Sequence, residues 1–472
     1  MIRLAIIGCG LSLVAACDAG TDPAEAVASL TVTPAVDSIE IGETITLDVL
    51  ARDGDGTTIA PLLAFASTVP AVAGVSSEGV VTGLHLGDAI IVVSAGAVAA
   101  VAEVAVLGPP EALDLQIEGE IQVIGDSMVV RGVALDGLGR VLPAPVTLSS
   151  LDPGVVEVTG GVITAIANGE GRVQAAAGTI ADTITVNVRA FTHPDGMIAA
   201  TPAVSARPYG VAISRNGVVL VVRLDAAAAS VDSLDGPLSF ASAIDVGLVP
   251  TSVAFSSDGA RAYSADQGGT ISIIDAATLA RIDQVPVQGS AFVVAVDSTG
   301  TVWAGSNQAW IYRIDPMTLV RDSVDVGDHV NGLAFAANRV FATDPAFGNV
   351  VAIDPITLAT STIAVGGRPQ GLVAHDGLLY VAREQGNVLL IDAATRGVVD
   401  SVGVSGGFGI AVSPDGARLY VTRFASGLSI VDLEGGGITN VTPGGDLRRV
   451  AFSFLGDVAI VTDQDNRLLV IR

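Results

Sequence analysis

Arginine side chains recur at matching places in the carboxyl-terminal part of the chain, where a pattern repeats about every 40 residues. Some follow the second apolar segment of a repeat, a place where other repeats carry Asp266, Asp344 or Asp463. Others lie in the loop that leads into the next repeat. Guanidinium groups that converge on one point bind carboxylates or phosphates through paired hydrogen bonds. The predicted ligand-binding residues are Arg207, Arg223, Arg368, Arg383, Arg423 and Arg448, and Arg449 lies in the same loop as Arg448.

A plainer interpretation of these arginines also fits the sequence. Each could pair with a nearby acid, such as Asp225, Glu384 or Asp446. In that case the arginines would form a charged rim with no ligand. The sequence leaves both interpretations open.

The elements that would position these arginines follow from the repeat itself. An apolar segment ends in Asp at six evenly spaced places, and each repeat holds four short apolar segments with turns such as Ser413-Pro414-Asp415-Gly416. Seven such units predict a seven-bladed β-propeller over residues 196–472. The last unit lacks an outer strand, so we expect 198–204 to supply it and close the ring. The Asp positions are Asp232, Asp275, Asp315, Asp354, Asp392 and Asp432.

Two motifs point to a known kind of repeat. The segments 380–383 (Tyr-Val-Ala-Arg) and 420–423 (Tyr-Val-Thr-Arg), with the Gly-x-x-Pro spacers at 247–250 and 366–369, resemble the YVTN-type β-propeller repeats of prokaryotic surface and periplasmic proteins. Such propellers include binding proteins, lactonase-like hydrolases and lyases. The resemblance implies a fold and leaves the chemistry open.

Catalytic and cofactor chemistry is not visible in the sequence. The four histidines are His85, His193, His329 and His375, and none shares a metal-binding spacing with another. A quinone-dependent propeller would repeat a docking tryptophan in its blades, but only Trp303 and Trp310 occur. No Gly-x-Ser-x-Gly elbow on a strand-to-helix turn is expected either, because the chain has an all-β pattern. We therefore predict no catalytic residue, no metal and no cofactor.

The chain before the repeats predicts two all-β sandwiches, at 29–107 and 109–190, because short alternating apolar segments are broken by Gly, Pro and Asp. The motifs at 67–73 and 79–87, which the second copy partly repeats at 150–156 and 161–169, resemble the bacterial Ig-like domain of group 2. Members of that family act as spacers and adhesive modules. Asp53 and Asp55 could suggest a calcium loop, but the remaining ligands are missing, so a hairpin turn is expected.

The amino terminus has the pattern of a targeting signal. Residues 1–16 hold Arg3 followed by an apolar run, and they are too short to span a bilayer as a mature helix. The tetrad Val14-Ala15-Ala16-Cys17 resembles the lipobox of bacterial lipoproteins, which implies cleavage before Cys17 and lipidation of its thiol. An ordinary secretory signal that ends near a cysteine is the alternative. If Cys17 is lipidated, residues 17–28 form a flexible tether between the lipid and the first sandwich.

Charge and architecture together narrow the function. A formal net charge of −26 repels phosphate backbones and disfavours nucleic acid as a partner. We expect a lipid-anchored cell-envelope binding protein, on the periplasmic or extracellular side, whose propeller binds a small anionic ligand, a glycan or a protein on its top face. The alternatives are a lactonase-like hydrolase or lyase, and a surface adhesin that binds through its sandwiches.

Overall fold

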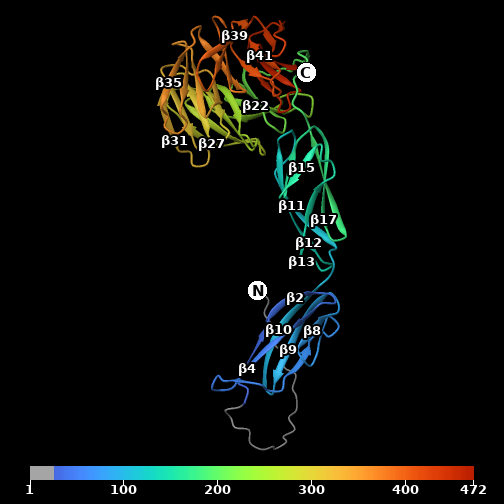
Figure 1. The fold of residues 1–472 in the computed structure, drawn as a ribbon. Coiled ribbons are helices and arrows are strands. Elements are labelled where there is room, and N and C mark those ends of the chain that lie inside the picture. The colour runs from blue at the N-terminus through green and yellow to red at the C-terminus, as the bar shows by residue number, and fades with distance from the viewer. Residues whose placement is uncertain (1–25) are drawn as a thin grey trace, which may run out of the picture. The chain divides into compact units, whose positions relative to one another are not determined.

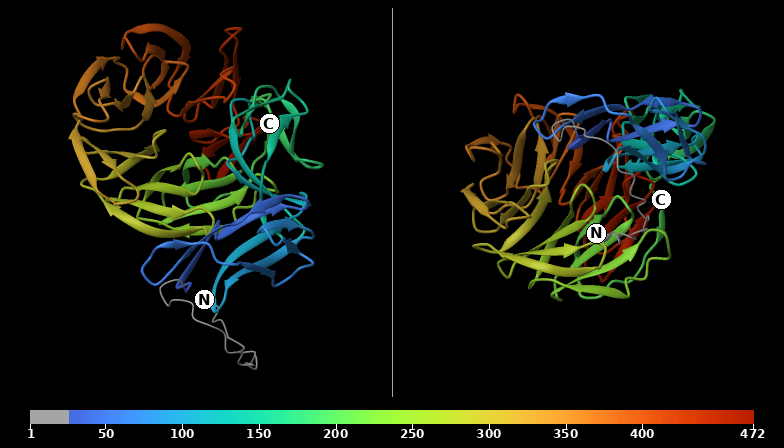
Figure 2. Two further views of the ribbon diagram at one scale, coloured as in Figure 1. Left: turned by 60° about the horizontal axis from the view of Figure 1, so that its bottom comes forward. Right: turned by 90° about the horizontal axis from the view of Figure 1, so that it is seen from below.

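The computed structural model describes residues 26–472, and all regular structure in this range is β. The ribbon views accordingly show arrows and loops without a coiled ribbon in the described part (Figures 1 and 2). No helix in the described range could cross a membrane. The predicted signal peptide 1–16, Cys17 and the tether up to residue 25 lie outside the described residues. The chain divides into two compact units, Met1–Arg189 and Ala190–Arg472.

The first part of unit 1 contains three small sheets around one apolar core. Buried residues alternate with exposed ones along the long strand β10, so one face of this strand is buried, as the alternating sequence predicts. The core contains Val32, Val81, Ile91 and Val104. The sheets are β1 (Ser29–Thr33), β4 (Asp48–Arg52) and β5 (Thr58–Ile59); β2 (Val36–Glu40), β10 (Val98–Leu107), β9 (Gly87–Ala95) and β6 (Ala64–Ser67); and β3 (Thr44–Thr46), β8 (Val80–Gly83) and β7 (Ala73–Val75).

The loop between β4 and β5 is a turn closed by its own aspartate. One Asp53 carboxylate oxygen accepts the backbone N–H groups of Asp55, at 3.0 Å, and Thr57, at 2.9 Å. The expected hairpin turn is confirmed, because this oxygen is occupied by backbone donors.

The second part of unit 1 has two sheets around a separate core. Val130, Val156, Ile163 and Val173 are buried in this core. The sheets are β11 (Ala112–Glu118), β12 (Ser127–Leu135), β16 (Val162–Ala165) and β15 (Val156–Thr159), with β13 (Val141–Pro145) on β12; and β14 (Thr147–Ser150), β17 (Gly169–Ala177) and β18 (Ile180–Val188).

Unit 2 consists of seven four-stranded antiparallel sheets, here called sheets 1 to 7 in chain order. Sheets 1 to 6 each contain four consecutive strands. Sheet 1 is β20 (Pro208–Ile213), β21 (Val218–Arg223), β22 (Ala228–Ser233) and β23 (Ser242–Asp245); sheet 2 is β24 (Pro250–Phe255), β25 (Arg261–Asp266), β26 (Thr270–Asp275) and β27 (Ala280–Pro286); sheet 3 is β28 (Ala291–Val296), β29 (Val302–Ser306), β30 (Trp310–Ile314) and β31 (Arg321–Asp325). Sheet 4 is β32 (Leu333–Ala336), β33 (Arg339–Asp344), β34 (Asn349–Ile353) and β35 (Thr360–Ala364); sheet 5 is β36 (Pro369–His375), β37 (Leu378–Arg383), β38 (Asn387–Asp392) and β39 (Val398–Ser405); sheet 6 is β40 (Ile410–Val412), β41 (Arg418–Thr422), β42 (Leu428–Asp432) and β43 (Ile438–Val441).

Sheet 7 joins the two ends of unit 2. It contains β44 (Leu447–Phe452), β45 (Ala459–Asp463), β46 (Arg467–Ile471) and, on the outside, β19 (Ile198–Ala200). Ala203 forms a further bridge with Arg467. The expected pairing of 198–204 with the last strand is therefore confirmed, although the regular strand is shorter than that range. The outer edge of β46 is covered as a result.

The sheets form a closed ring around a channel. The first strand of each sheet packs against the first strand of the next, and β20 of sheet 1 also packs against β44 of sheet 7. Apolar side chains fill the spaces between neighbouring sheets. Between sheets 7 and 1, for example, Val211, Val219, Ile460 and Leu468 form one buried cluster. The second strands are buried on both faces for this reason, which explains their continuous apolar sequence.

In sheets 2 to 6 an aspartate at the end of the third strand closes the following hairpin. In sheet 4, one Asp354 carboxylate oxygen accepts the N–H groups of Ile356, at 3.0 Å, and Thr357, at 2.9 Å. These backbone donors lower the pKa of Asp354. Asp275, Asp315, Asp392 and Asp432 make equivalent bonds in their sheets. The repeated Asp of the sequence is thus a turn residue.

Candidate functional site

Two edges of the ring offer different loops. The upper edge carries the loops that lead into each first strand and those between the second and third strands. The lower edge carries the turns between first and second strands and the hairpins between third and fourth strands. Strand register fixes equivalent positions: Pro208 pairs with Arg223, Pro369 with Arg383 and Leu447 with Asp463. All predicted ligand-binding arginines therefore lie at the upper edge.

The arginines at the ends of second strands fasten loops. Arg383 donates from Nη1 to the Val365 carbonyl, at 2.7 Å, and from Nε to the Asn387 carbonyl, at 2.8 Å. In sheet 2 the equivalent Asp266 accepts the Gly247 N–H, at 3.1 Å. Asp266 therefore holds the corresponding loop as a hydrogen-bond acceptor, whereas Arg383 holds its loop as a donor. Arg383 thus binds a loop through its carbonyl oxygen, and Asp266 binds the equivalent loop through its N–H group.

Arg423 and Arg223 occupy the same position in sheets 6 and 1. Arg423 donates from Nη2 to the Ser426 carbonyl, at 3.1 Å, and to Asn440 Oδ1, at 2.9 Å. The Nε atoms of Arg223 and Arg423 are buried and have no hydrogen-bond partner in the described part of the chain. Neither arginine forms an ion pair among residues 26–472.

The arginines of the loops that lead into the sheets have the partners that the plainer interpretation predicted. Arg207 pairs with Asp225 at 3.4 Å, Arg368 with Glu384 at 3.1 Å, and Arg448 with Asp446 at 2.6 Å. Arg207 and Arg448 also both donate to Gln464 Oε1, at 3.4 and 3.1 Å. These contacts bring Arg207 and Arg448 together, whereas Arg383 and Arg423 bond to the loops around them.

A different arginine spans the channel. Arg449 belongs to a ring of equivalent positions whose other members are small or apolar: Gly210, Ser252, Val293, Gly332, Gly371 and Gly409. Four are glycines because the next first strand passes so close; a Cβ on Gly409 would lie 2.2 Å from the Arg448 carbonyl. The Arg449 side chain reaches from sheet 7 to sheet 4, where Nη2 donates to the Asn331 carbonyl and to Asn331 Oδ1, at 3.0 and 2.9 Å. A cavity of about 120 Å³ lies here.

Aromatic rings surround the two adjacent arginines. The Arg448 guanidinium carbon lies 4.7 Å from the Phe424 ring centroid and 5.2 Å from that of Phe408. The Arg449 guanidinium carbon lies 4.9 Å from the Phe408 centroid and 6.0 Å from that of Tyr209. These are cation–π distances. We call the group Tyr209, Phe408, Phe424, Arg448 and Arg449 the channel mouth.

The geometry of Phe424 is unusual for a bulky residue. Its φ of 50° lies in the left-handed region, which favours glycine. Its carbonyl accepts the Leu447 N–H at 3.3 Å, which ties this loop to the first strand of sheet 7. Phe240, Leu279 and Leu358 share this conformation elsewhere in unit 2, so the φ of Phe424 fixes the path of its loop and does not by itself mark a site.

Burial shapes the electrostatics of the channel mouth. It lowers the pKa of Arg449, and the neighbouring Arg448 charge acts in the same direction. Arginine stays protonated because its ordinary pKa is so high. Burial also raises the pKa of Tyr209, so this phenol is neutral. Among residues 26–472, Arg449 forms no ion pair with a carboxylate, which leaves a cation inside the channel without a counter-charge.

A polar chain continues from Arg449 around the mouth. Asn331 Nδ2 donates to Gln370 Oε1, and Gln370 Nε2 donates to Glu384 Oε1 at 2.8 Å. Asn331 and Gln370 are both buried. His329 lies nearby with its ring centroid 4.8 Å from that of Phe292, and burial lowers the pKa of His329.

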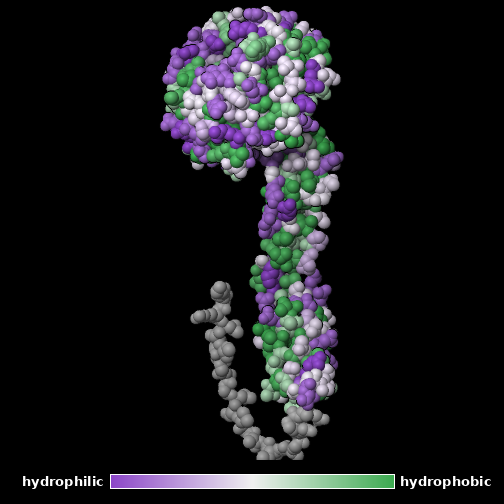
Figure 3. Space-filling view, turned by 90° about the vertical axis from the view of Figure 1, so that its left-hand side faces the viewer, coloured by the Kyte–Doolittle hydropathy of each residue, from purple (hydrophilic) through white to green (hydrophobic). Residues whose placement is uncertain are grey.

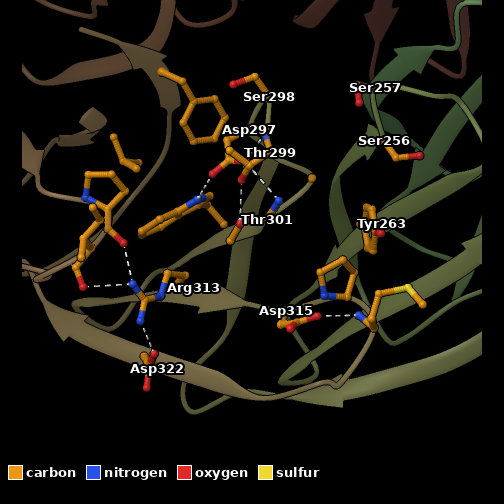
Figure 4. Close-up of a pocket in the computed structure, with 18 of the residues that line it drawn as sticks. Ser256, Ser257, Tyr263, Asp297, Ser298, Thr299, Thr301, Arg313, Asp315 and Asp322 are labelled. Atoms are coloured by element: carbon orange, nitrogen blue, oxygen red, sulfur yellow. Dashed lines mark hydrogen bonds and ion pairs between the residues drawn. The ribbon is translucent and has the colours of Figure 1, made fainter. Parts of the chain in front are cut away.

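A larger hollow, the lower hollow, lies at the lower edge of sheets 2 to 4 (Figure 4). Its volume is about 1670 Å³. Several of its charged groups have partners: Asp297 accepts the Trp303 indole N–H at 2.9 Å, and Arg313 pairs with Asp322. Arg261 donates to the Pro316 carbonyl at 2.9 Å. Arg261 and Arg339, which also line the hollow, form no ion pair among residues 26–472.

Metal chemistry finds no support in the described residues. Residues 26–472 contain no group of three or more His, Cys, Asp or Glu side chains that could hold a metal ion.

Comparison with known proteins supports the fold alone. No protein-family model matches the sequence, and no curated protein matches it. Solved structures do match by shape. One is a chain of hydrazine synthase from Kuenenia stuttgartiensis, a β-propeller-containing protein, with a TM-score of 0.52 and 15% identity; the match covers 60% of this chain and 97% of that chain. At this identity the likeness concerns the all-β fold. The YVTN and Ig-like resemblances rest on their motifs.

Sequence reasoning missed most of the channel mouth. It included Arg448 but not the rings of Tyr209, Phe408 and Phe424, and it did not include Arg449 among its final site residues. A signal was available at the position directly before the ring of small and apolar residues that includes Arg449. The residues there are Tyr209, Thr251, Phe292, Asn331, Gln370, Phe408 and Arg448. Aligning this position across the repeats would have placed these side chains in one ring.

Proposed function

We propose that this chain is a lipid-anchored binding protein of the cell envelope, in which two bacterial Ig-like domains carry a seven-bladed YVTN-type β-propeller. The seven sheets and their closure through β19 support the propeller. The lipobox-like tetrad before Cys17 supports the anchor. The propeller binds an anion at the channel mouth on its top face.

One observation carries the binding proposal. Arg449 lies in the channel with amide and carbonyl partners from Asn331 and two aromatic faces, and no carboxylate neutralises it in the described part of the chain. A partly buried charge without a counter-charge is costly, and a bound anion would reduce that cost. Each charge-assisted hydrogen bond to such an anion contributes about 1.5–3 kcal/mol.

Calorimetric titration of the full chain in detergent with a panel of carboxylates and phosphates tests this function. Arg449→Met should weaken the binding of any anion that binds the wild type by about tenfold or more. Arg281→Met is the matched control, because Arg281 is exposed on the outer strand β27. If both variants bind like the wild type, the channel mouth is not the site.

The anchor is tested separately. Cys17→Ser should leave the protein unprocessed or release it from membranes, because two acyl chains give stable attachment where one is marginal. Processing at the same place with full retention in the membrane fraction would contradict the anchor.

A further inference from the structure

The channel mouth limits the charge of the anion it can bind. Arg448 and Arg449 are adjacent, but Arg448 already pairs with Asp446 at 2.6 Å. The pair of arginines therefore carries about one positive charge that is not neutralised. A second negative charge on the ligand would find no further free cation in this pair, and the Asp446 carboxylate beside Arg448 would repel it. A monoanion fits this balance, whereas a phosphate dianion does not.

The donors that remain on Arg449 fit a carboxylate. Of its guanidinium nitrogens, only Nη2 donates to protein groups in the described part of the chain, and both bonds go to Asn331. Nε and Nη1 remain for a ligand. Their hydrogens point to different edges of the guanidinium, because each two-donor edge includes Nη2, so a ligand carboxylate would accept a single charge-assisted hydrogen bond from one of them.

The walls of the mouth fit an apolar ligand body. Phe408 is buried, and the Phe424 ring lies 4.8 Å from it, centroid to centroid, while remaining partly exposed. Tyr209 completes the wall, with its centroid 6.1 Å from that of Phe408. Beneath the mouth, the channel is lined by small and aliphatic residues such as Val253 and Leu372 and encloses about 120 Å³. This space admits only a small group.

From these features we propose that the ligand is a small monocarboxylate with an apolar or aromatic body. Its carboxylate would pair with Arg449 inside the channel, and its body would lie against Phe408 and Phe424. This inference rests on the proposed anion-binding function and narrows it to one ligand class.

The test compares three probes on the full chain in detergent: benzoate, its uncharged analogue benzamide, and inorganic phosphate. Benzoate should bind, and benzamide and phosphate should each bind at least about tenfold more weakly. Binding of benzoate should also weaken with added salt, because a charge pair contributes to it.

Variants separate the two parts of the site. Arg449→Met should weaken benzoate binding by about tenfold or more, and Arg449→Lys should have a smaller effect because it keeps the positive charge. Phe424→Ala should weaken benzoate binding several-fold through the loss of a stacking face. Arg281→Met should leave it unchanged. Arg449→Lys and Phe424→Ala keep the test decisive if Arg449→Met fails to fold.

The outcomes distinguish this inference from the function on which it rests. If phosphate binds through Arg449 and benzoate does not, the monocarboxylate class is wrong while anion binding stands. The inference is also wrong if benzoate and benzamide bind with equal affinity, or if none of the variants changes the affinity for benzoate. If no anion binds, both proposals fall.

Discussion

The channel mouth and the lower hollow lie at opposite edges of the same ring of sheets, and both contain arginines. In the lower hollow, Arg313 pairs with Asp322 and also donates to the Pro355 carbonyl at 2.5 Å. In the channel mouth, Arg449 has only amide and carbonyl partners from Asn331 in the described part of the chain. The volume of a hollow is thus a poor guide to binding here. Arg261 and Arg339 in the lower hollow also lack a carboxylate partner in the described part of the chain, so the two regions differ in the aromatic rings that lie within cation–π distance of Arg449.

The surface of unit 2 also contains single exposed apolar residues. The face of unit 2 seen in Figure 3 mixes hydrophilic and hydrophobic residues. Single apolar residues on a surface need no functional explanation. Met317 and Ile356, at the tips of two neighbouring hairpins, are 76% and 82% exposed beside the lower hollow, and nothing in the structure shows what would cover them.

The largest expected effect concerns the ring that positions both regions. Deleting 196–204 should destabilise unit 2 by roughly 3–5 kcal/mol, because it exposes the β46 edge and removes buried Val204. Deleting 18–190 removes no strand of unit 2 and should change the melting temperature of its transition little. Calorimetric melting of both truncations checks this. Equal melting temperatures would refute closure through β19.

A smaller effect is expected in the lower hollow. Asp297→Ala leaves the indole N–H of fully buried Trp303 without its partner and should cost about 1–3 kcal/mol of unfolding free energy. Benzoate binding should not change, because the residue lies at the other edge. Chemical unfolding and titration on the same variant measure both quantities. If Asp297→Ala loses benzoate binding while its unfolding free energy is unchanged, benzoate binds in the lower hollow and not at the channel mouth.

The smallest expected effect is on acid stability. Backbone donors lower the pKa of Asp354 below its ordinary value of 3.8, so its stabilising contribution is complete above that value and is lost as pH falls through the lower folded pKa. Asp354→Asn keeps a hydrogen-bonding side chain without the charge. We expect the urea midpoint of unfolding of this variant to lie below that of the wild type at about pH 6. The difference between the two midpoints should become smaller as the pH is lowered to about 2. A deficit that stays constant with pH would show that charge plays no part in this turn.

The sequence predicted the repeating part of the molecule well for a physical reason. Turn chemistry and apolar periodicity are local, so the strand ends at Asp275 and Asp315 and the pairing of β19 with β46 could be predicted from their patterns. The hydrogen bonds by which these aspartates close the hairpins came from the structure. The arginines at the ends of second strands were correctly aligned across the repeats. Their partners are loop carbonyls such as that of Val365, and a sequence does not show which backbone group a loop turns toward them.

The candidate site was harder to predict because it is assembled across the ring. Arg449 and Asn331 are far apart in sequence, and their hydrogen bonds depend on the diameter of the channel. The wall formed by Phe408 and Phe424 depends on the left-handed backbone at Phe424, which no local rule for a phenylalanine predicts. Such contacts follow from closure of the ring and therefore require the structure.

The most direct test of the central claim is to locate a bound carboxylate. Anomalous diffraction from crystals of the full chain soaked with 4-bromobenzoate would position the bromine, and the difference density would position the carboxylate. We predict one bromine peak at the channel mouth, with the carboxylate within hydrogen-bonding distance of the Arg449 guanidinium and the ring against Phe424. A bromine peak in the lower hollow, with an empty channel mouth, would contradict the account.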